Sequence, residues 1–340
     1  MAVEFQRSTA DDAHAIMELM LDVYNASRDV FFNNHGLFHW KYFAQGPEWK
    51  GSRGYVMRTS NGISAHLGIC PAAFASRGGR LSGIGLMDWV SRHDAPGLGT
   101  LLLRKVLANV DVAIVAGGSA ATQRIIPRLG FVQTGELEIF AKVLRPWCQF
   151  RSRLSGPSCR DALRLVRNVA WTLTTTVTSD WNARRTREFG TDALVQPQAD
   201  GVPLRTTRFL NYWLRNPAVA ASGFTLEEQG QVRGYFVLSR VGHQTRIVDL
   251  RAQGAEEEWA AAFATANSAA AADPDTYEVI ATSVTPLIRN ALLRCGFRYR
   301  RSVPLFLYDP QQRLSKGRLF WSLIEDDSGY IRDSAHPYET

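Results

Sequence analysis

The sequence lacks the features that would place it at once in several common classes. It contains only four cysteines, and their spacing does not match a metal site. No apolar run approaches the roughly 20 residues that a membrane-spanning helix needs. No zinc-finger or RNA-recognition motif is visible, so we expect no nucleic-acid partner. The N-terminal residues include several acids and no apolar signal core, which predicts a cytoplasmic protein with reduced thiols and no bound metal.

The bulk composition is that of a globular protein with enough apolar residues for full cores. The chain has 340 residues, of which 45% are apolar and 21% are charged, and its formal net charge is +7. This length favours two domains of roughly 150 residues each. The positive charge favours anionic partners such as phosphates, nucleotides or a membrane surface, without choosing among them.

An internal repeat is the most informative pattern in the chain. Residues 119–131 and 285–297 align without a gap, and both segments begin with a hydroxyl residue and end in Gly-Phe. A hydroxyl residue is typical of a helix N-cap, and a glycine is typical of the position that ends a helix. Upstream, residues 86–89 resemble residues 247–250, which places an aspartate at the same point of both halves. The chain therefore looks like one module written twice.

Hydrophobic spacing and turn residues predict the same order of elements in the two halves. In the first half we expect strands at 3–8, 55–58, 63–69, 80–91, 112–115 and 131–144, and helices at 10–27, 37–44, 101–109 and 120–129. In the second half we expect a hairpin that turns at Gly230, helices at 206–215, 255–272 and 286–295, and strands at 245–252, 277–282 and 297–308. The first strand and helix of the second half are not obvious, and they are either missing or formed by residues 158–195.

A strand, a turn with two glycines and a helix follow one another in residues 86–106. Gly97 and Gly99 let backbone N–H groups approach an anion closely, and a helix N-terminus adds a favourable dipole. The dipole contributes only ~0.3–1 kcal/mol per charge, so several N–H donors would have to act together on a diphosphate. Taken alone, the pattern fits a tight strand-to-helix turn equally well.

Together with the helix that ends at Gly130-Phe131, this order resembles the GCN5-related N-acetyltransferase (GNAT) superfamily. The resemblance covers most of residues 3–144 and, more loosely, residues 206–310. It implies an α/β (α+β) fold of two GNAT-like modules, each with a mixed, mostly antiparallel central sheet flanked by helices. It also implies a glycine loop that holds the pyrophosphate of acyl-CoA, with acetyl-CoA as the first expectation, and nearby backbone N–H groups that bind the thioester oxygen. The residues that the resemblance assigns to acyl-CoA are Trp89, Val90, Ser91, Pro96, Gly97, Leu98, Gly99, Thr100 and Ser119, of which Ser119 fits an N-cap as well.

Two positions depart from the family pattern. Asp94 stands where the family loop usually has Arg or Gln, and its carboxylate would repel phosphates unless Arg92, Arg104 or Lys105 compensates. Ile126 stands where the family often has a tyrosine that protonates the departing thiolate. The usual general acid is therefore absent, and another group or water must take its place.

Two residues are candidates for catalysis. The resemblance implies direct attack of an amine on the thioester in one ternary complex, which needs a base for the ammonium proton. Asp88 is the leading candidate, because burial in an apolar strand would raise its pKa. The alternative is a folding role shared with Asp249, in which each carboxylate bonds backbone at a strand bulge. His93 either relays a proton or lies exposed on the loop. His39 and Tyr42 lie on the helix that in this family commonly borders the acceptor site.

The second module and the tail carry weaker signals. Residues 251–258 have one glycine and three glutamates where a phosphate loop would stand, so we expect no second acyl-CoA site. The acidic tail that begins at Trp321 includes Asp326-Asp327, and it either caps the second module or is partly loose.

The segment between the modules is basic. Arg160, Arg164 and Arg167 fall at helical spacing, with apolar residues on another face. One interpretation is an amphipathic helix on anionic lipid. The favoured interpretation is a helix that bridges the modules and has a solvated basic side.

These observations divide the chain into a GNAT-like domain with the acyl-CoA site (1–145), a basic helical linker (146–205), a degenerate GNAT-like domain (206–310) and a C-terminal tail (311–340). The expected function is acyl-CoA-dependent N-acylation, with acetyl as the expected group, of a small amine such as an amino sugar or an amino-acid derivative. Two alternatives stay open. One is a catalytically silent scaffold or ligand-binding protein, and the other is an acyltransferase supplied by an acidic acyl-carrier protein.

Overall fold

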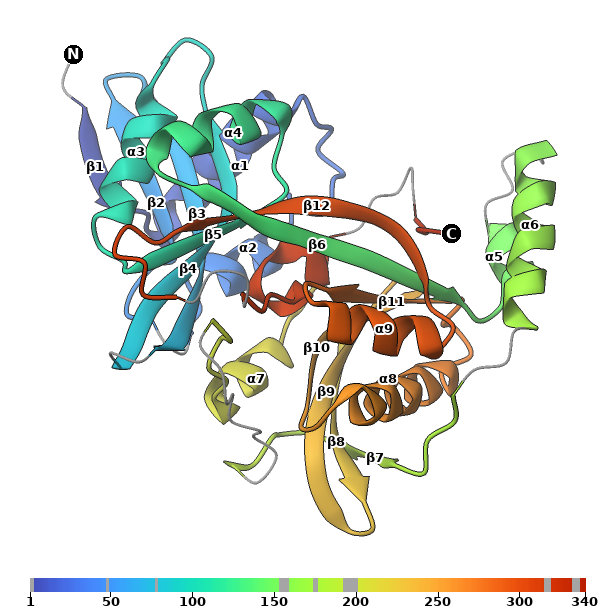
Figure 1. Ribbon diagram of the computed structural model, residues 1–340. Helices are drawn as coiled ribbons and strands as arrows, with labels where there is room; N and C mark the ends of the chain where they lie inside the picture. The colour runs from blue at the N-terminus through green and yellow to red at the C-terminus, as the bar shows by residue number, and fades with distance from the viewer. Residues whose placement is uncertain are drawn as a thin grey trace.

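A single sheet of 12 strands runs through the molecule, with helices packed against it (Figure 1). The computed structural model describes residues 3–46, 49–76, 79–152, 159–173, 177–191, 201–314, 319–331 and 337–340. The strands are β1 (Glu4–Arg7), β2 (Gly54–Thr59), β3 (Gly62–Ser76), β4 (Gly79–Ser91), β5 (Val112–Ala116), β6 (Val132–Val143), β7 (Asn182–Thr186), β8 (Ala220–Glu228), β9 (Gln231–Val241), β10 (Gln244–Ala252), β11 (Glu278–Ser283) and β12 (Arg298–Tyr308). The helices are α1 (Ala13–Tyr24), α2 (His35–Tyr42), α3 (Leu98–Leu107), α4 (Ala120–Ile125), α5 (Pro146–Ser152), α6 (Cys159–Thr172), α7 (Thr207–Trp213), α8 (Glu256–Ala271) and α9 (Pro286–Arg294), with 3-10 turns η1 (Ala10–Asp12), η2 (Ile126–Leu129), η4 (Leu323–Glu325) and η5 (Asp327–Gly329).

The strand order places the last strand of each half beside strands of the other half. The order is β1-β2-β3-β4-β5-β12-β6-β11-β10-β9-β8-β7, so β7 takes in the second half the edge position that β1 has in the first. The first strand of the second half, which the sequence did not reveal, is therefore β7. It lies within residues 158–195, in the segment that we expected to be a helical linker. β12 pairs with β5 and β6 on its two sides, and β6 pairs with β11. The two expected sheets are therefore joined into one, because each half places its last strand beside the other half (Figure 1).

The repeated helix ends are as the sequence predicts. Gly130 and Gly296 have positive φ angles of 90° and 80°, the left-handed conformation that glycine adopts without strain. Phe131 and Phe297, the residues after them, are both buried in the core. Their N–H groups donate to carbonyls five residues earlier, which closes the last helical turn in each half.

Helices and the C-terminal segment cover opposite faces of the sheet. α3 packs on one face of the first half, and α8 and α9 pack on one face of the second. The opposite faces carry α1, α2, α7 and the tail residues 319–331. Trp40 of α2 stacks on Tyr212 of α7 with ring centroids 4.8 Å apart, so the two halves meet there. Residues 319–331 pack against both halves, so this part of the tail does not cap the second half alone.

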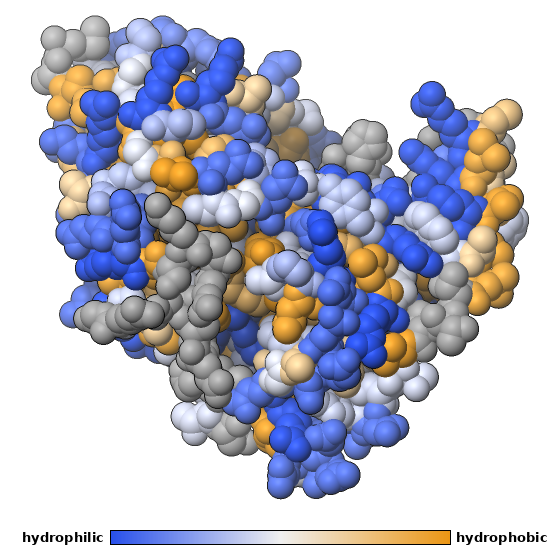
Figure 2. All heavy atoms as spheres, viewed as in Figure 1, coloured by the Kyte–Doolittle hydropathy of each residue, from blue (hydrophilic) through white to orange (hydrophobic). Residues whose placement is uncertain are grey.

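α5 and α6 lie at one side of the molecule, at the end of β6 (Figure 1). The space-filling view shows apolar atoms along the outer edge of α6 (Figure 2). Across the part of the chain that the structure covers, no helix combines the length and apolar character needed to cross a bilayer. Within the expected linker, residues 153–158, 174–176 and 192–200 lie outside the described residues.

Candidate active site

β4 and β5 open away from each other at the point where the sequence places the site. The two parallel strands pair only from Gly83 to Gly85, opposite Val112 to Ile114. β4 continues for six residues beyond this point, and among the described residues no other strand pairs with it on that side. The register of β4 against β3 shifts around Asp88, whose φ angle is 45°. The strand is thus bulged where its edge becomes free.

The N-terminus of α3 lies beside this opening. Gly97, with a φ angle of 83°, is the N-cap, so α3 begins at Leu98, three residues earlier than the sequence predicted. Gly99 and Thr100 therefore belong to the first helical turn. The N–H groups of Gly97, Gly99 and Thr100 have no hydrogen-bond acceptor within the described part of the chain. Several free N–H donors at the positive end of a helix dipole are an arrangement that can bind an anion.

The two glycines of this turn differ in why the position lacks a side chain. A Cβ on Gly97 would meet no atom within 4 Å, so this backbone is open to a ligand. A Cβ on Gly99 would lie 3.0 Å from the Ser91 hydroxyl and 3.2 Å from the Trp89 indole nitrogen. Trp89 donates from Nε1 to the Gly99 carbonyl at 2.9 Å, which fixes α3 against β4. Gly99 thus permits close approach of the helix to the strand.

The departure at Asp94 is compensated locally. Arg92 Nε lies 3.1 Å from the Asp94 carboxylate, and the hydrogen bond from Arg92 lowers the pKa of Asp94. Arg104 and Lys105 lie in the last turn of α3, at the end away from the glycines. Of the three expected counter-charges, Arg92 is therefore the one that pairs with Asp94.

Among the described residues, four others that the sequence analysis singled out make no hydrogen bond with Asp88, whose partners are Lys41 and Tyr42. Ser119 is exposed and accepts a hydrogen bond from the Thr122 N–H at 3.2 Å, as an N-cap does. Ile126 is fully buried in the core beneath α3. His93 and His39 are exposed.

Asp88 belongs to a buried charge cluster rather than being a free base. Lys41 Nζ lies 2.5 Å from the Asp88 carboxylate and 3.1 Å from that of Asp327. Tyr42 donates its hydroxyl proton to Asp88 as well. Burial raises the pKa of Asp88, but the Lys41 ammonium and the two hydrogen bonds outweigh it and lower the pKa overall. The expectation of a raised pKa was wrong, because it counted burial without the lysine brought in from α2.

Asp249 has an equivalent cluster in the second half. β10 is bulged at this residue, as β4 is at Asp88. Arg205 Nε lies 2.7 Å from the Asp249 carboxylate and also pairs with Glu325, while Tyr235 donates to Asp249 at 2.8 Å. Burial raises the pKa of Asp249, but Arg205 and the other partners lower it to about 2. The two aspartates therefore share a role, but it is to join a strand bulge to the C-terminal segment through a basic side chain.

The C-terminal segment contributes a carboxyl group that the sequence did not assign. Burial and the adjacent Asp327 charge raise the pKa of Asp326 to about 7. Asp326, Lys41 and Met87 help to line a small cavity of about 30 Å³ beside the β4 bulge. The carbonyl of Glu325 lies only 2.7 Å from where a Cβ on Gly85 would stand, so the segment crosses β4 where the strands part. The sequence shows the acidic residues of the tail, but it does not show that the tail places them beside β4.

A larger cavity of about 930 Å³ lies between the halves. Strands β6, β10 and β12 line it, together with the C-terminal segment. The end of β5 and the residues that follow it, through Gly118, complete the lining. Arg246 and Arg301 supply its positive charge. Arg246 donates to the Ser328 carbonyl at 2.5 Å, and Arg301 pairs with Glu339 at 2.8 Å. Burial lowers the pKa of Arg246 to about 10, which leaves it charged near neutrality.

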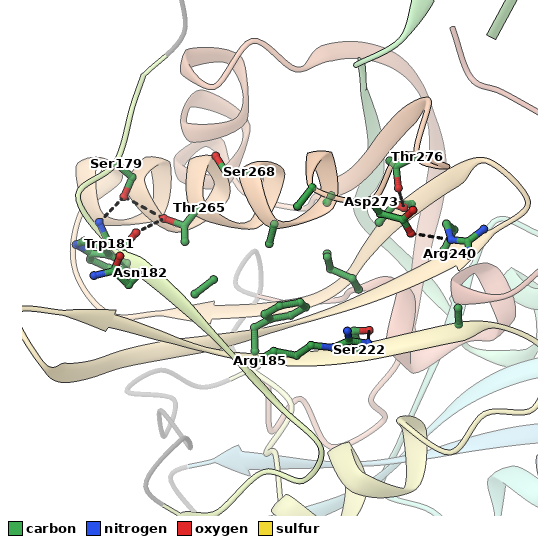
Figure 3. A pocket seen from close by; sticks show the side chains of 18 of the residues that line it. Ser179, Trp181, Asn182, Arg185, Ser222, Arg240, Thr265, Ser268, Asp273 and Thr276 are labelled. Carbon is green, nitrogen blue, oxygen red and sulfur yellow. Dashed lines mark hydrogen bonds and ion pairs between the residues drawn. The ribbon is translucent and has the colours of Figure 1, made fainter. Parts of the chain in front are cut away.

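The second half has a cavity of its own, of about 730 Å³, between α8 and strands β7 to β9 (Figure 3). Some of its labelled polar side chains pair with each other, as Arg240 does with Asp273 and Thr265 does with Ser179 (Figure 3). β10 and β11 also pair over only three positions. At the N-terminus of α8, however, the Glu258 carboxylate accepts the Ala255 N–H at 2.8 Å. Among the described residues, the N–H of the N-cap residue of α8 is therefore already paired, unlike the N–H of Gly97 at the start of α3.

Comparison with solved structures identifies the fold. A conserved protein of Enterococcus faecalis, for which N-acyltransferase activity is suggested, shares 12% identity with a TM-score of 0.56, over 93% of this chain and 75% of that one. A GCN5-related N-acetyltransferase of Anabaena variabilis shares 10% identity with a TM-score of 0.57, over 90% and 72% of the two chains. The N-myristoyltransferase of Saccharomyces cerevisiae, solved with myristoyl-CoA bound, shares 11% identity with a TM-score of 0.56, over 90% and 82%. No protein-family model matches the chain, and no curated protein matches it significantly. The chain therefore has the fold of the GCN5-related N-acetyltransferases, as its sequence pattern predicted.

Proposed function

We propose that the chain is an acyl-CoA-dependent N-acyltransferase whose first half holds the acyl-CoA. The observation that carries this proposal is the opening between β4 and β5 beside the unpaired N–H groups of Gly97, Gly99 and Thr100. An extended pantetheine arm can pair with the free edge of β4 as an added strand would, while the diphosphate accepts from the turn. The names of the proteins with the same fold support this class of reaction, and acetyl remains the first expected acyl group.

The second half is proposed to bind no acyl-CoA of its own. It repeats the strand opening, but Glu258 already satisfies the start of α8. Its contribution would be to complete the cavity between the halves, where we place the acceptor amine. Arg246 in that cavity favours an amine that also carries an anionic group, such as an amino-acid derivative or an acidic amino sugar, whereas Arg301 is already paired with Glu339.

Asp326 is our proposed general base. The amine nitrogen would bond to the thioester carbon as the carbon–sulfur bond breaks, and water would carry the ammonium proton to Asp326. Asp326 lines the small cavity, and its neighbours Leu323 and Ser328 line the larger cavity in which we place the amine. Water would protonate the departing thiolate, since Ile126 stands at the usual tyrosine position. The earlier assignment of this role to Asp88 stays untested, and its lowered pKa argues against it. No contact supports a role for His93, which also stays untested.

The test is thiol release from acetyl-CoA and longer acyl-CoAs in the presence of a panel of small anionic amines. We expect activity of the native chain to fall as the pH drops through about 7, because Asp326 must be ionised to accept a proton. Asp326→Asn should lower kcat/KM by about 10²–10⁴-fold and remove this acidic limb. Asp180→Asn, a change at an exposed aspartate, is the matched control. An unaltered pH profile in Asp326→Asn would exclude Asp326 as the base.

A further inference from the structure

The outer face of α6 is apolar, which is the reverse of an ordinary surface helix. Leu163, Val166 and Val169 are 70%, 68% and 41% exposed, and Leu173, directly after the helix, is 80% exposed. Their spacing of three to four residues places them along one side of the helix. Figure 2 shows this stripe at the outer edge of the molecule, away from the sheet. Single exposed apolar residues are normal, but a continuous stripe indicates an interaction surface.

The polar side of α6 faces the protein instead. Asn168 is almost fully buried and donates to the Gln149 side chain of α5 at 2.8 Å. Gln149 in turn donates to Glu278 of β11 at 3.1 Å. This buried hydrogen-bond chain fixes the rotation of α6 about its axis. The apolar stripe therefore cannot turn inward without breaking polar contacts, which excludes the expected arrangement of a bridging helix with its apolar side packed against the modules.

Basic and aromatic side chains border the stripe. Residues 145–173 contain six arginines and a single aspartate, with no lysine or glutamate. Arg160 and Arg164 are exposed on α6, and the Trp147 indole of α5 is 57% exposed. Arginine stems can cover apolar surface while their guanidinium groups reach anionic headgroups, and tryptophan favours the boundary between water and hydrocarbon. A second copy of this chain would present the same cluster of positive charge, so charge complementarity disfavours self-association.

We propose that α6, with Trp147, docks the protein on the surface of an anionic lipid bilayer. The apolar stripe enters the boundary between headgroups and acyl chains, and the arginines contact the lipid phosphates. The helix then lies in the plane of the membrane without crossing it. This surface is independent of the proposed acyl-CoA site, so either proposal can fail alone.

The experiment is co-sedimentation of the intact chain with vesicles of phosphatidylcholine alone or with phosphatidylglycerol added. We expect binding to the anionic vesicles that is about tenfold or more tighter than to the neutral ones and that weakens with salt. Leu163→Gln/Val166→Gln should reduce this binding by about tenfold or more, with an unchanged melting temperature because both side chains are exposed. Leu287→Gln/Leu293→Gln, on exposed positions of α9, is the matched control and should bind as the native chain does.

Two results would overturn the proposal. One is equal or absent binding of the native chain to both kinds of vesicle. The other is a native dimer in light scattering that Leu163→Gln/Val166→Gln converts to a monomer, without vesicle binding, which would assign the stripe to a second copy. Loss of vesicle binding in Arg160→Gln/Arg164→Gln would support the lipid assignment.

Discussion

At the scale of single residues, two buried charge clusters hold the C-terminal segment against the sheet. Lys41 lies between Asp88 and Asp327, and Arg205 lies between Asp249 and Glu325. The second cluster is more deeply buried, because the side chains of its carboxylates are at most 1% exposed, compared with 12% and 19% in the first. Removing one partner leaves a buried charge uncompensated, and the resulting loss of folding stability increases with the burial of that charge.

Replacing the basic residue of each cluster should therefore have unequal effects. We expect Arg205→Met to lower the free energy of unfolding by about 3–5 kcal/mol. Lys41→Met should lower it by less, because water reaches Asp88 and Asp327 more easily. Urea unfolding at neutral pH gives both values. A larger loss of unfolding free energy in Lys41→Met than in Arg205→Met would contradict the view that burial determines the size of the effect.

How well the sequence predicted a contact depended on how local it was. The N-cap at Ser119 and the pair Arg92–Asp94 join residues that are two or three positions apart. The sequence therefore indicated both, Ser119 as an N-cap and Arg92 as a counter-charge to Asp94. The contact between Lys41 and Asp327 joins residues 286 positions apart, and no local pattern indicates it. The raised pKa of Asp326 has the same origin, since burial by distant segments produces it.

At the scale of elements, the start of α3 is the place where we propose that the diphosphate binds. The helix begins earlier than its hydrophobic spacing predicts because Gly97 adopts a positive φ angle and caps it. Gly99 then lies so close to β4 that an added Cβ would require Ser91 or Trp89 to shift. Helix periodicity does not predict this boundary, because the backbone conformation of Gly97 sets it.

Gly99→Ala tests whether this packing positions the helix. The added methyl group would press on Ser91 and Trp89, and we expect a loss of about 1–3 kcal/mol in stability. Gly135→Ala, in β6, is the control, because its Cβ would meet no atom within 4 Å. Thermal unfolding compares the two variants. Equal melting temperatures for both would contradict a close fit between α3 and β4.

At the scale of the whole molecule, the two halves are joined by exchanged strands. The sequence predicted two modules and nearly all of their strands, because each strand has its own pattern. It did not predict that β12 lies between β5 and β6, since strand order is set by pairing between distant segments. The boundaries at 145, 205 and 310 stay predictions, although β6 and β12 each contact both halves.

This exchange predicts that the intact chain unfolds in one cooperative step. Neither half can lose its strands without exposing the edge and core of the other. Scanning calorimetry should show a single transition whose calorimetric and van't Hoff enthalpies agree. Two resolved transitions would indicate halves that are stable separately.

The central claim is that the turn at Gly97, beside the opening of β4 and β5, holds the diphosphate of acyl-CoA. Isothermal titration with acetyl-CoA tests it most directly, using the native chain, Gly97→Trp and Gly230→Trp. Gly97 and Gly230 have φ angles of 83° and 79°, and a Cβ on either would meet nothing within 4 Å, so the two variants carry similar strain. We predict binding by the native chain and by Gly230→Trp, and a loss of about tenfold or more in Gly97→Trp. No binding by the native chain at millimolar acetyl-CoA would favour a scaffold or a carrier-protein-dependent enzyme, and equal binding by Gly97→Trp would contradict the site.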